Sequence, residues 1–130
     1  MLLHQLLIAV FTIAYAWHSQ IAINKMRNHG ASRWESKDFH TGSVIMRAAP
    51  IVIILLIDFN VWSLLTLPLL QWMLFDLSIN KFMEWPLFYL GTTAKIDRKL
   101  FKWWGKDAGR YKLYICASLI FILNLLNILL

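Results

Sequence analysis

Long apolar stretches dominate this sequence, and the last of them is the most complete. Residues 113–130 (LYICASLIFILNLLNILL) are 18 residues without a charged side chain. An α-helix rises about 1.5 Å per residue, so this stretch is nearly long enough to span a hydrocarbon core of about 30 Å. Two further stretches, 2–23 and 44–75, are almost as apolar. Stretches of this kind predict helices that cross a membrane.

The composition supports this prediction. Hydrophobic residues make up 59% of the chain and charged residues only 15%. Soluble domains are about 45–50% apolar, with about a quarter of their residues charged. The composition therefore excludes a disordered tail and a fibrous repeat, and it indicates an integral membrane protein. Cys116 is the only cysteine, which excludes a disulfide within the chain and a cysteine-based zinc site.

The boundaries of the predicted helices follow from the polar interruptions and the prolines. A single helix over 44–75 would be roughly 48 Å long, which is too long for one crossing. Pro68 is the natural break, because proline suits a first helical turn and interrupts a helix interior. We therefore expect an all-α, four-helix polytopic membrane bundle in one domain, 1–130, with helices at 2–23, 44–66, 68–84 and 113–130.

The first apolar stretch has an alternative interpretation as a cleaved signal peptide. Ala14-Tyr15-Ala16 has the small-x-small form of a cleavage site. No Lys or Arg precedes the apolar part, however, whereas a signal peptide begins with a positively charged region. This difference favours a retained transmembrane helix.

The net charge of +6 is concentrated in two connections, 24–43 and 95–112. Together they hold eleven of the thirteen Lys and Arg residues. Four crossings place both connections on one side, and the positive-inside rule makes that side cytoplasmic, with both termini facing outward. Basic charge beside apolar helices is typical of orientation and of contact with anionic lipid. We therefore expect membrane lipids, especially anionic ones, as partners, and no nucleic acid.

The second basic connection mixes its charges with apolar and aromatic residues. Tryptophans beside lysines are typical of a helix that lies in the headgroup layer. Trp17 and Trp85 are expected to join two tryptophans of this segment in an aromatic belt that fixes the depth of the protein. The residues predicted to contact headgroups are Lys95, Arg98, Lys99, Lys102, Trp103, Trp104, Lys106, Arg110 and Lys112.

Several polar residues fall within the predicted helices. Asp58 and Asp76 lie ten and eight residues from Pro68, which places both near mid-depth in a hairpin that turns there. Asp76, Asn80 and Glu84 follow i, i+4, i+8 spacing and form one polar stripe. Ionisable groups at that depth are costly and face a partner or a water-filled cavity.

Two interpretations of these four residues stay open. In the first, Asp58 and Asp76 share a proton or bond to neighbouring amides, and the stripe holds the helices together. In the second, the stripe lines a cavity for an ion, a proton or a lipid headgroup. For the amides of Asn124 and Asn127, the first interpretation is favoured.

A second constellation of polar residues lies on the predicted cytoplasmic side. His18, Asp38, His40 and Glu84 are residue types that hold Zn²⁺, Mn²⁺ or Fe²⁺, and such a metal can activate water against a headgroup phosphate or ester. The alternative is that the histidines bond headgroups or backbone carbonyls. No His-Glu-x-x-His motif is present, so we expect no cofactor, with a divalent metal as the alternative. Ser43, Ser63 and Ser78 lack a G-x-S-x-G context, which argues against a serine hydrolase.

One resemblance bears on the biological setting. The segments 75–80 (FDLSIN) and 89–97 (YLGTTAKID) resemble small hydrophobic membrane proteins encoded by bacteriophages, over about a fifth of the chain. Those proteins have no assigned activity, so the resemblance implies a phage-linked membrane setting and no catalytic role. The expected location is the inner (cytoplasmic) membrane or an internal membrane of a phage.

Three functional hypotheses follow. The first is a non-enzymatic membrane component of a phage or its host, expected to form homo-oligomers, in which the polar stripe assembles the bundle or binds a small ligand or ion. The second is a metal-dependent hydrolase of a lipid or a headgroup phosphate at the cytoplasmic membrane face. The third is a holin-like pore former, whose helices line water in the assembled state.

Overall fold

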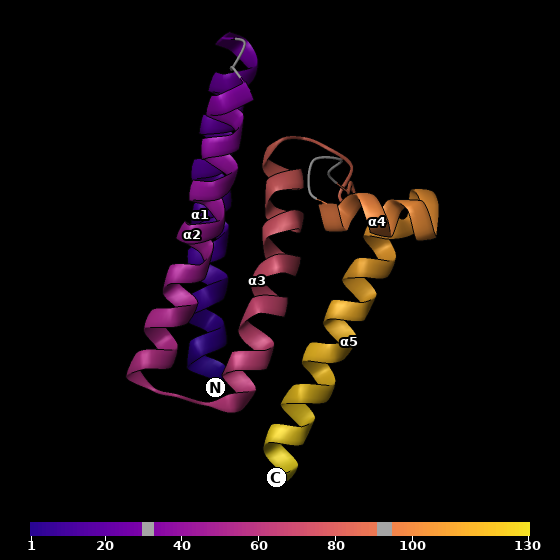
Figure 1. The fold of residues 1–130 in the computed structure, drawn as a ribbon. Helices are drawn as coiled ribbons and strands as arrows, with labels where there is room; N and C mark the ends of the chain where they lie inside the picture. The colour runs from indigo at the N-terminus through magenta and orange to yellow at the C-terminus, as the bar shows by residue number, and fades with distance from the viewer. Residues whose placement is uncertain (30–32, 91–94) are drawn as a thin grey trace.

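The computed structural model describes residues 1–29, 33–90 and 95–130, and side chains within 1–28, 41–90 and 96–130. No strand occurs in these residues, so the all-α prediction is confirmed (Figure 1). The elements are α1 (Leu2–His29), α2 (Arg33–Ile57), α3 (Val61–Phe82), α4 (Lys95–Trp104), the 3-10 turn η1 (Gly105–Asp107) and α5 (Ala108–Leu129).

Three segments of the described chain are long and apolar enough to cross a membrane. They are Leu2–Asn28, Val61–Phe82 and Ile96–Leu129, while Thr41–Ile57 in α2 is a shorter apolar helix. The third segment includes α4, which lies to one side of the bundle at a steep angle to α5, so α5 supplies its apolar crossing (Figure 1). The chain is therefore a small membrane protein.

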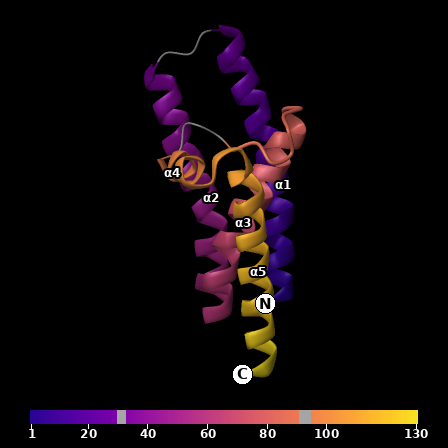
Figure 2. The ribbon, with the colours of Figure 1, turned by 90° about the vertical axis from the view of Figure 1, so that its right-hand side faces the viewer.

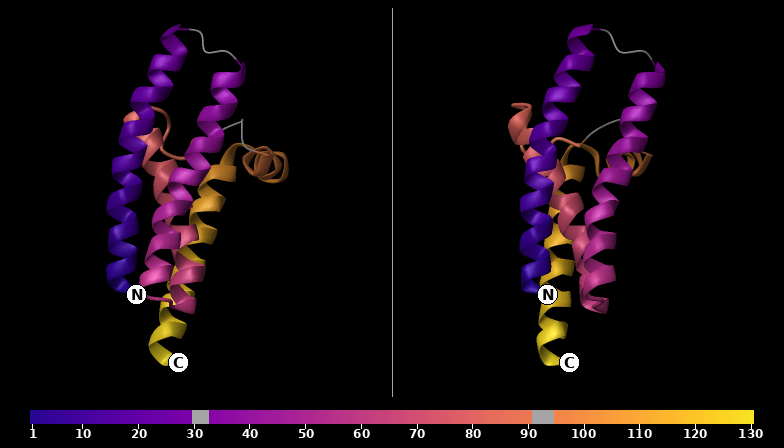
Figure 3. Two further views of the ribbon diagram at one scale, coloured as in Figure 1. Left: turned by 60° about the vertical axis from the view of Figure 1, so that its left-hand side comes forward. Right: turned by 90° about the vertical axis from the view of Figure 1, so that its left-hand side faces the viewer.

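The long helices run up and down in a bundle with α3 at its centre. α3 contacts α1, α2 and α5, and α4 contacts α5. Both termini lie at one end of the bundle (Figures 1 and 2). The hairpin of α1 and α2 extends past the level of α4 at the other end, as Figure 3 also shows. We call the end with the termini the terminal end and the end with α4 the basic end.

The break between the second and third long helices differs from the prediction. The chain turns at residues 58–60, and Pro68 lies inside α3. Asn60 is the cap of α3, because its side-chain oxygen accepts hydrogen bonds from the backbone N–H groups of Trp62 and Ser63 at 2.8 and 3.1 Å. Proline is tolerated within membrane helices, where neighbouring groups satisfy the freed backbone. The predicted boundaries 44–66 and 68–84 are therefore wrong.

The other helices extend beyond their apolar stretches. α1 continues past residue 23, and α2 begins at Arg33, so most of the predicted connection 24–43 is helical. α5 begins at Ala108 rather than at residue 113, and the connection 95–112 contains α4, η1 and the first turn of α5. Hydropathy marks the part of a helix that faces lipid, whereas backbone hydrogen bonds continue the helix into water.

Packing in the bundle is inverted relative to that of a soluble protein. Polar residues are buried along the contact of α1 with α3, where Thr12, Ser63 and Thr66 have no exposed surface. Large apolar residues such as Leu56, Phe121 and Ile128 are exposed on the outer faces. Small and polar residues allow membrane helices to approach closely and to bond across their contact, while lipid covers the apolar exterior. This pattern agrees with the membrane assignment.

Candidate functional site

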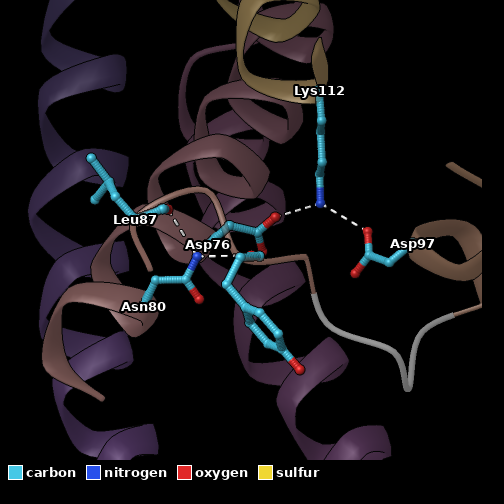
Figure 4. A network of polar contacts seen from close by, with 6 residues as sticks. Asp76, Asn80, Leu87, Asp97 and Lys112 are labelled. Carbon is cyan, nitrogen blue, oxygen red and sulfur yellow. Dashed lines mark hydrogen bonds and ion pairs between the residues drawn. The ribbon is translucent and has the colours of Figure 1, made fainter. Parts of the chain in front are cut away.

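The most developed polar site lies at the basic end, where α3, α4 and α5 meet. The ammonium group of Lys112 on α5 contacts the carboxylate of Asp76 on α3 and lies 3.0 Å from Oδ1 of Asp97 on α4 (Figure 4). We call these three residues the ion triplet. Because each member comes from a different helix, the ion triplet fixes all three helices relative to one another.

The ion triplet is largely withdrawn from the surface. The side chain of Lys112 is 5% exposed, that of Asp97 13% and that of Asp76 29%. The Lys112 ammonium also lies 4.0 Å from the ring centroid of Trp72, a cation–π contact. A buried ammonium needs such partners, because burial removes its hydration.

Asn80 organises the chain that follows α3. Its side-chain nitrogen donates hydrogen bonds to the backbone carbonyls of Leu87 and Tyr89, at 3.0 and 2.9 Å (Figure 4). Asn80 lies one helical turn after Asp76, so a single face of α3 holds both α5 and this connection. The side chain of Trp85 stacks edge-on against Tyr89, with ring centroids 5.2 Å apart.

A close backbone approach joins this connection to α5. A Cβ atom added to Gly109 would lie 2.0 Å from the carbonyl oxygen of Phe88, so no larger residue fits there. The guanidinium of Arg110 lies 5.5 Å from the centroid of the Phe88 ring. A small pocket opens beside the ion triplet, between α3, the connection and α5; its lining includes Asp76, Asn80 and Lys112.

A second polar cluster lies at the terminal end. His4 Nδ1 on α1 is 2.9 Å from Ser63 Oγ on α3, and His4 Nε2 is 3.1 Å from Oδ2 of Asp58 in the turn before α3. We call these three residues the histidine cluster. Its composition matches that of a Ser-His-Asp triad, but Ser63 has no exposed surface, so no substrate reaches its hydroxyl. The cluster instead joins α1 to the α2–α3 turn.

The predicted intramembrane set is only partly brought together. Asp58 belongs to the turn at the terminal end, while Asp76 lies about 24 Å along the axis of α3 from Asn60. The two carboxylates therefore do not share a proton, and the turn at Pro68 from which their mid-depth positions were predicted lies instead at residues 58–60. Asn80 is buried next to Asp76, whereas Glu84 lies beyond the end of α3 and is exposed, with a φ of 57°. The predicted stripe thus ends at Asn80.

Of the two amides on α5, Asn124 joins helices as the favoured interpretation predicts, whereas Asn127 does not in the part of the chain that the structure describes. The Gln5 side chain on α1 donates to Asn124 Oδ1 at 2.9 Å, which links α1 and α5 across the bundle. Asn124 also donates to the carbonyl of Ile120 within its own helix. The Asn127 side chain makes no hydrogen bond to any described residue.

The residues predicted to contact headgroups are distributed over α4, η1 and the start of α5. Arg98, Lys99, Lys102 and Trp103 are exposed on α4, and Lys106 and Arg110 are exposed beyond it. The prediction for Lys112 is wrong, because its position on the inner face of α5 directs it to the two aspartates. The side chain of Lys95 lies outside the described residues.

The predicted metal ligands are only partly described. His18 and Glu84 are both exposed, and the side chains of Asp38 and His40 lie outside the described residues. Among the side chains that the structure describes, no three His, Cys, Asp or Glu groups gather where they could hold a metal ion.

Sequence reasoning missed Lys112, His4 and Ser63 as members of polar clusters. Lys112 immediately precedes the apolar residues 113–130, and this position suggested a headgroup contact. Its spacing from Ala108 and Cys116 by four residues is the one signal of an inner face, because both neighbours are buried. Comparisons with known proteins add no further assignment: no family model matches the chain, and no curated protein or solved structure is significantly similar to it.

Proposed function

We propose that this chain is a non-enzymatic membrane protein that binds anionic lipid headgroups at one membrane face. In this proposal α4 lies in the headgroup layer, and the ion triplet holds it there against the bundle. The predicted phage or host membrane is the setting that we propose for it, on the basis of the sequence resemblance. The basic end then faces the cytoplasm, and both termini face outward.

The two faces of α4 support this proposal. Arg98, Lys99 and Lys102 follow i, i+1, i+4 spacing on one face, and all are exposed. Ile96 and Trp103, spaced by seven residues on the other face, are 58% and 69% exposed. Apolar side chains beside a basic face are typical of a helix that lies at the boundary between headgroups and acyl chains.

The contact between Asp97 and Lys112 carries the proposal. Asp97 lies in the first turn of α4, so its 3.0 Å contact ties the start of the helix to α5. At the other end of α4, Gly105 has a φ of 60°, a conformation that glycine adopts readily and that turns the chain into α5. With both ends fixed, α4 is held at a steep angle to α5 instead of continuing it (Figure 1).

Helix lengths give a depth for α4. Along α5, Lys112 lies about 27 Å from Leu130, and along α3, Asp76 lies about 24 Å from Asn60. These lengths are close to a hydrocarbon thickness of about 30 Å. The ion triplet therefore falls near one boundary of the apolar slab and the histidine cluster near the other, and α4 lies at the headgroup level.

The test is the lipid that co-purifies with the protein from membranes of mixed phosphatidylglycerol and phosphatidylcholine. Mass spectrometry of the bound lipid should show enrichment of phosphatidylglycerol, which should fall several-fold in the double variant Lys99→Gln/Lys102→Gln, because each lysine near an anionic surface contributes about 1 kcal/mol. The double variant Lys25→Gln/Arg27→Gln removes two exposed charges from α1 and is the matched control. Equal loss in both variants, or no enrichment in the unaltered protein, would contradict the proposal.

A further inference from the structure

Arg47 is the one charged side chain in the apolar part of α2, and its environment is incomplete. It lies six residues from Thr41 and ten from Ile57, which places its Cα about 9 Å inside the apolar segment. Its side chain is half-buried, and no carboxylate among the described residues lies within 4 Å of it; Asp76 on α3 attracts it from a greater distance and is itself paired with Lys112. A charged group at this depth needs a partner.

Three contacts fix where this guanidinium points. Its Nε donates to the carbonyl of Ser43 at 3.2 Å, one turn nearer the basic end. Its central carbon lies 4.6 Å from the centroid of the Phe75 ring on α3. The Gln71 side chain donates to the backbone carbonyl of Arg47 at 2.7 Å, which fastens this part of α2 to α3.

Pro50 lies three residues after Arg47 and loosens this turn of α2. A proline inside a helix lacks the N–H group that would bond four residues back, and its ring pushes the preceding turn away. The carbonyl that loses its N–H partner is that of Met46, so the helix is weakened in the same turn that contains Arg47. The Arg47 backbone is therefore held by a side chain of α3 at the point where α2 is weakened.

The terminal nitrogens of Arg47 remain without a hydrogen-bond partner among the described residues. Stacking on Phe75 uses the face of the guanidinium, and Ser43 uses its Nε, which leaves the edge between the two terminal nitrogens, with one parallel pair of N–H groups, available. Side chains lean toward the N-terminus of their helix, so this edge is directed toward the basic end and the headgroup level. A planar edge of this kind binds a phosphate oxygen pair in bidentate geometry.

We infer that Arg47 is a binding site for the phosphodiester of a single membrane lipid, held at the seam of α2 and α3. Lipid is the source of the phosphate, because the residues beside Arg47 in α2 are apolar and exposed on the outside of the bundle: Val44, Ile45 and Met46. These side chains contact acyl chains, while Arg47 holds the headgroup. This site goes beyond the proposed function, because it uses no residue of α4.

The test is native mass spectrometry of the purified full chain after mild delipidation and addition of phosphatidylglycerol. The unaltered protein should retain one lipid at detergent concentrations that remove the rest. Arg47→Gln should weaken that binding about tenfold or more, the scale of one lost charge-assisted hydrogen bond. Arg47→Lys should show an intermediate loss, because an ammonium cannot bind two oxygens in parallel.

Three controls separate the alternatives. Arg27→Gln changes an exposed arginine of α1 and should leave the retained lipid in place. Lys99→Gln/Lys102→Gln should also leave it in place, so failure of the α4 proposal and failure of this one give different results. Inorganic phosphate, added in the absence of lipid, should not raise the melting temperature of the unaltered protein.

Two results would overturn the inference. The first is an unchanged retained lipid in Arg47→Gln. The second is stabilisation by inorganic phosphate equal to that by phosphatidylglycerol, which would identify a site for a free anion. If Arg47→Gln does not fold, Gln71→Leu replaces it, because this change keeps the Arg47 charge but removes the hydrogen bond that holds the Arg47 backbone to α3. Gln71→Leu should weaken lipid retention relative to Arg27→Gln, which serves as the folded reference. Unchanged lipid retention in Gln71→Leu would also contradict the inference.

Discussion

The two ends of this bundle each carry a three-residue polar cluster, but the clusters differ in burial and charge. In the ion triplet the Lys112 side chain is 5% exposed and contacts two carboxylates. In the histidine cluster Asp58 is 69% exposed, and His4 bridges it to a hydroxyl. An exposed carboxylate keeps its hydration when its partner is lost, whereas a buried one does not. Similar contact distances therefore have very different consequences for stability.

The difference also separates the roles of the two ends. The ion triplet joins α3, α4 and α5, so it sets the position of α4 relative to the bundle. The histidine cluster joins α1 to the turn before α3, where Asn60 already caps the helix. We therefore expect damage to the basic end to change both stability and lipid binding, and damage to the terminal end to change stability alone.

The largest expected effect comes from Lys112→Met. This change leaves the half-buried carboxylates of Asp76 and Asp97 without the buried cation that pairs with them, and breaking a buried ion pair typically costs about 3–5 kcal/mol. Titration of the purified protein with a denaturing detergent measures the free energy of unfolding. The triple variant Lys112→Met/Asp76→Leu/Asp97→Leu replaces the whole ion triplet by apolar groups and should recover most of the loss. A loss below about 1 kcal/mol in the single variant would show that the two clusters are energetically alike.

A smaller loss is expected from Gly109→Ala. The new methyl group would collide with the backbone carbonyl of Phe88, which cannot move aside as a side chain does, so we expect a loss of about 1–3 kcal/mol. Gly42→Ala is the matched control, since a Cβ there meets nothing within 4 Å and alanine favours a helix. Equal melting temperatures for the two variants would contradict the close approach of α5 to the connection after α3.

The smallest effect is expected from His4→Leu at the terminal end. It removes the partner of the buried Ser63 hydroxyl, at a cost of about 1 kcal/mol, and leaves Asp58 hydrated. The double variant His4→Leu/Ser63→Ala removes both polar groups and should be closer to the unaltered protein in melting temperature. If His4→Leu lowered the free energy of unfolding as much as Lys112→Met does, the expected energetic difference between the two ends would be contradicted.

The sequence by itself determined the class of the protein. Hydropathy adds along the chain and needs no knowledge of contacts, so residues 2–23, 44–75 and 113–130 were enough to predict an all-α membrane bundle. Counting crossings then placed both basic connections at one end, and α4, the end of α1 and the start of α2 do lie there (Figure 1). The turn at 58–60 was also within reach of the sequence, because Asn60 before an apolar run is a typical helix cap. The prediction instead placed the break at Pro68, although membrane helices tolerate proline.

The partners of the charged residues were decided only in three dimensions. Lys112 and Asp76 are 36 residues apart, and their contact depends on how α3 and α5 are rotated about their own axes. Asp97 completes the ion triplet only because the chain changes direction at Gly105, between α4 and α5. Rotation and crossing angle arise from packing between helices, which a pattern along one helix does not contain. For this reason the composition predicts that the chain enters a membrane, and the tertiary structure decides which of its charges remain buried there.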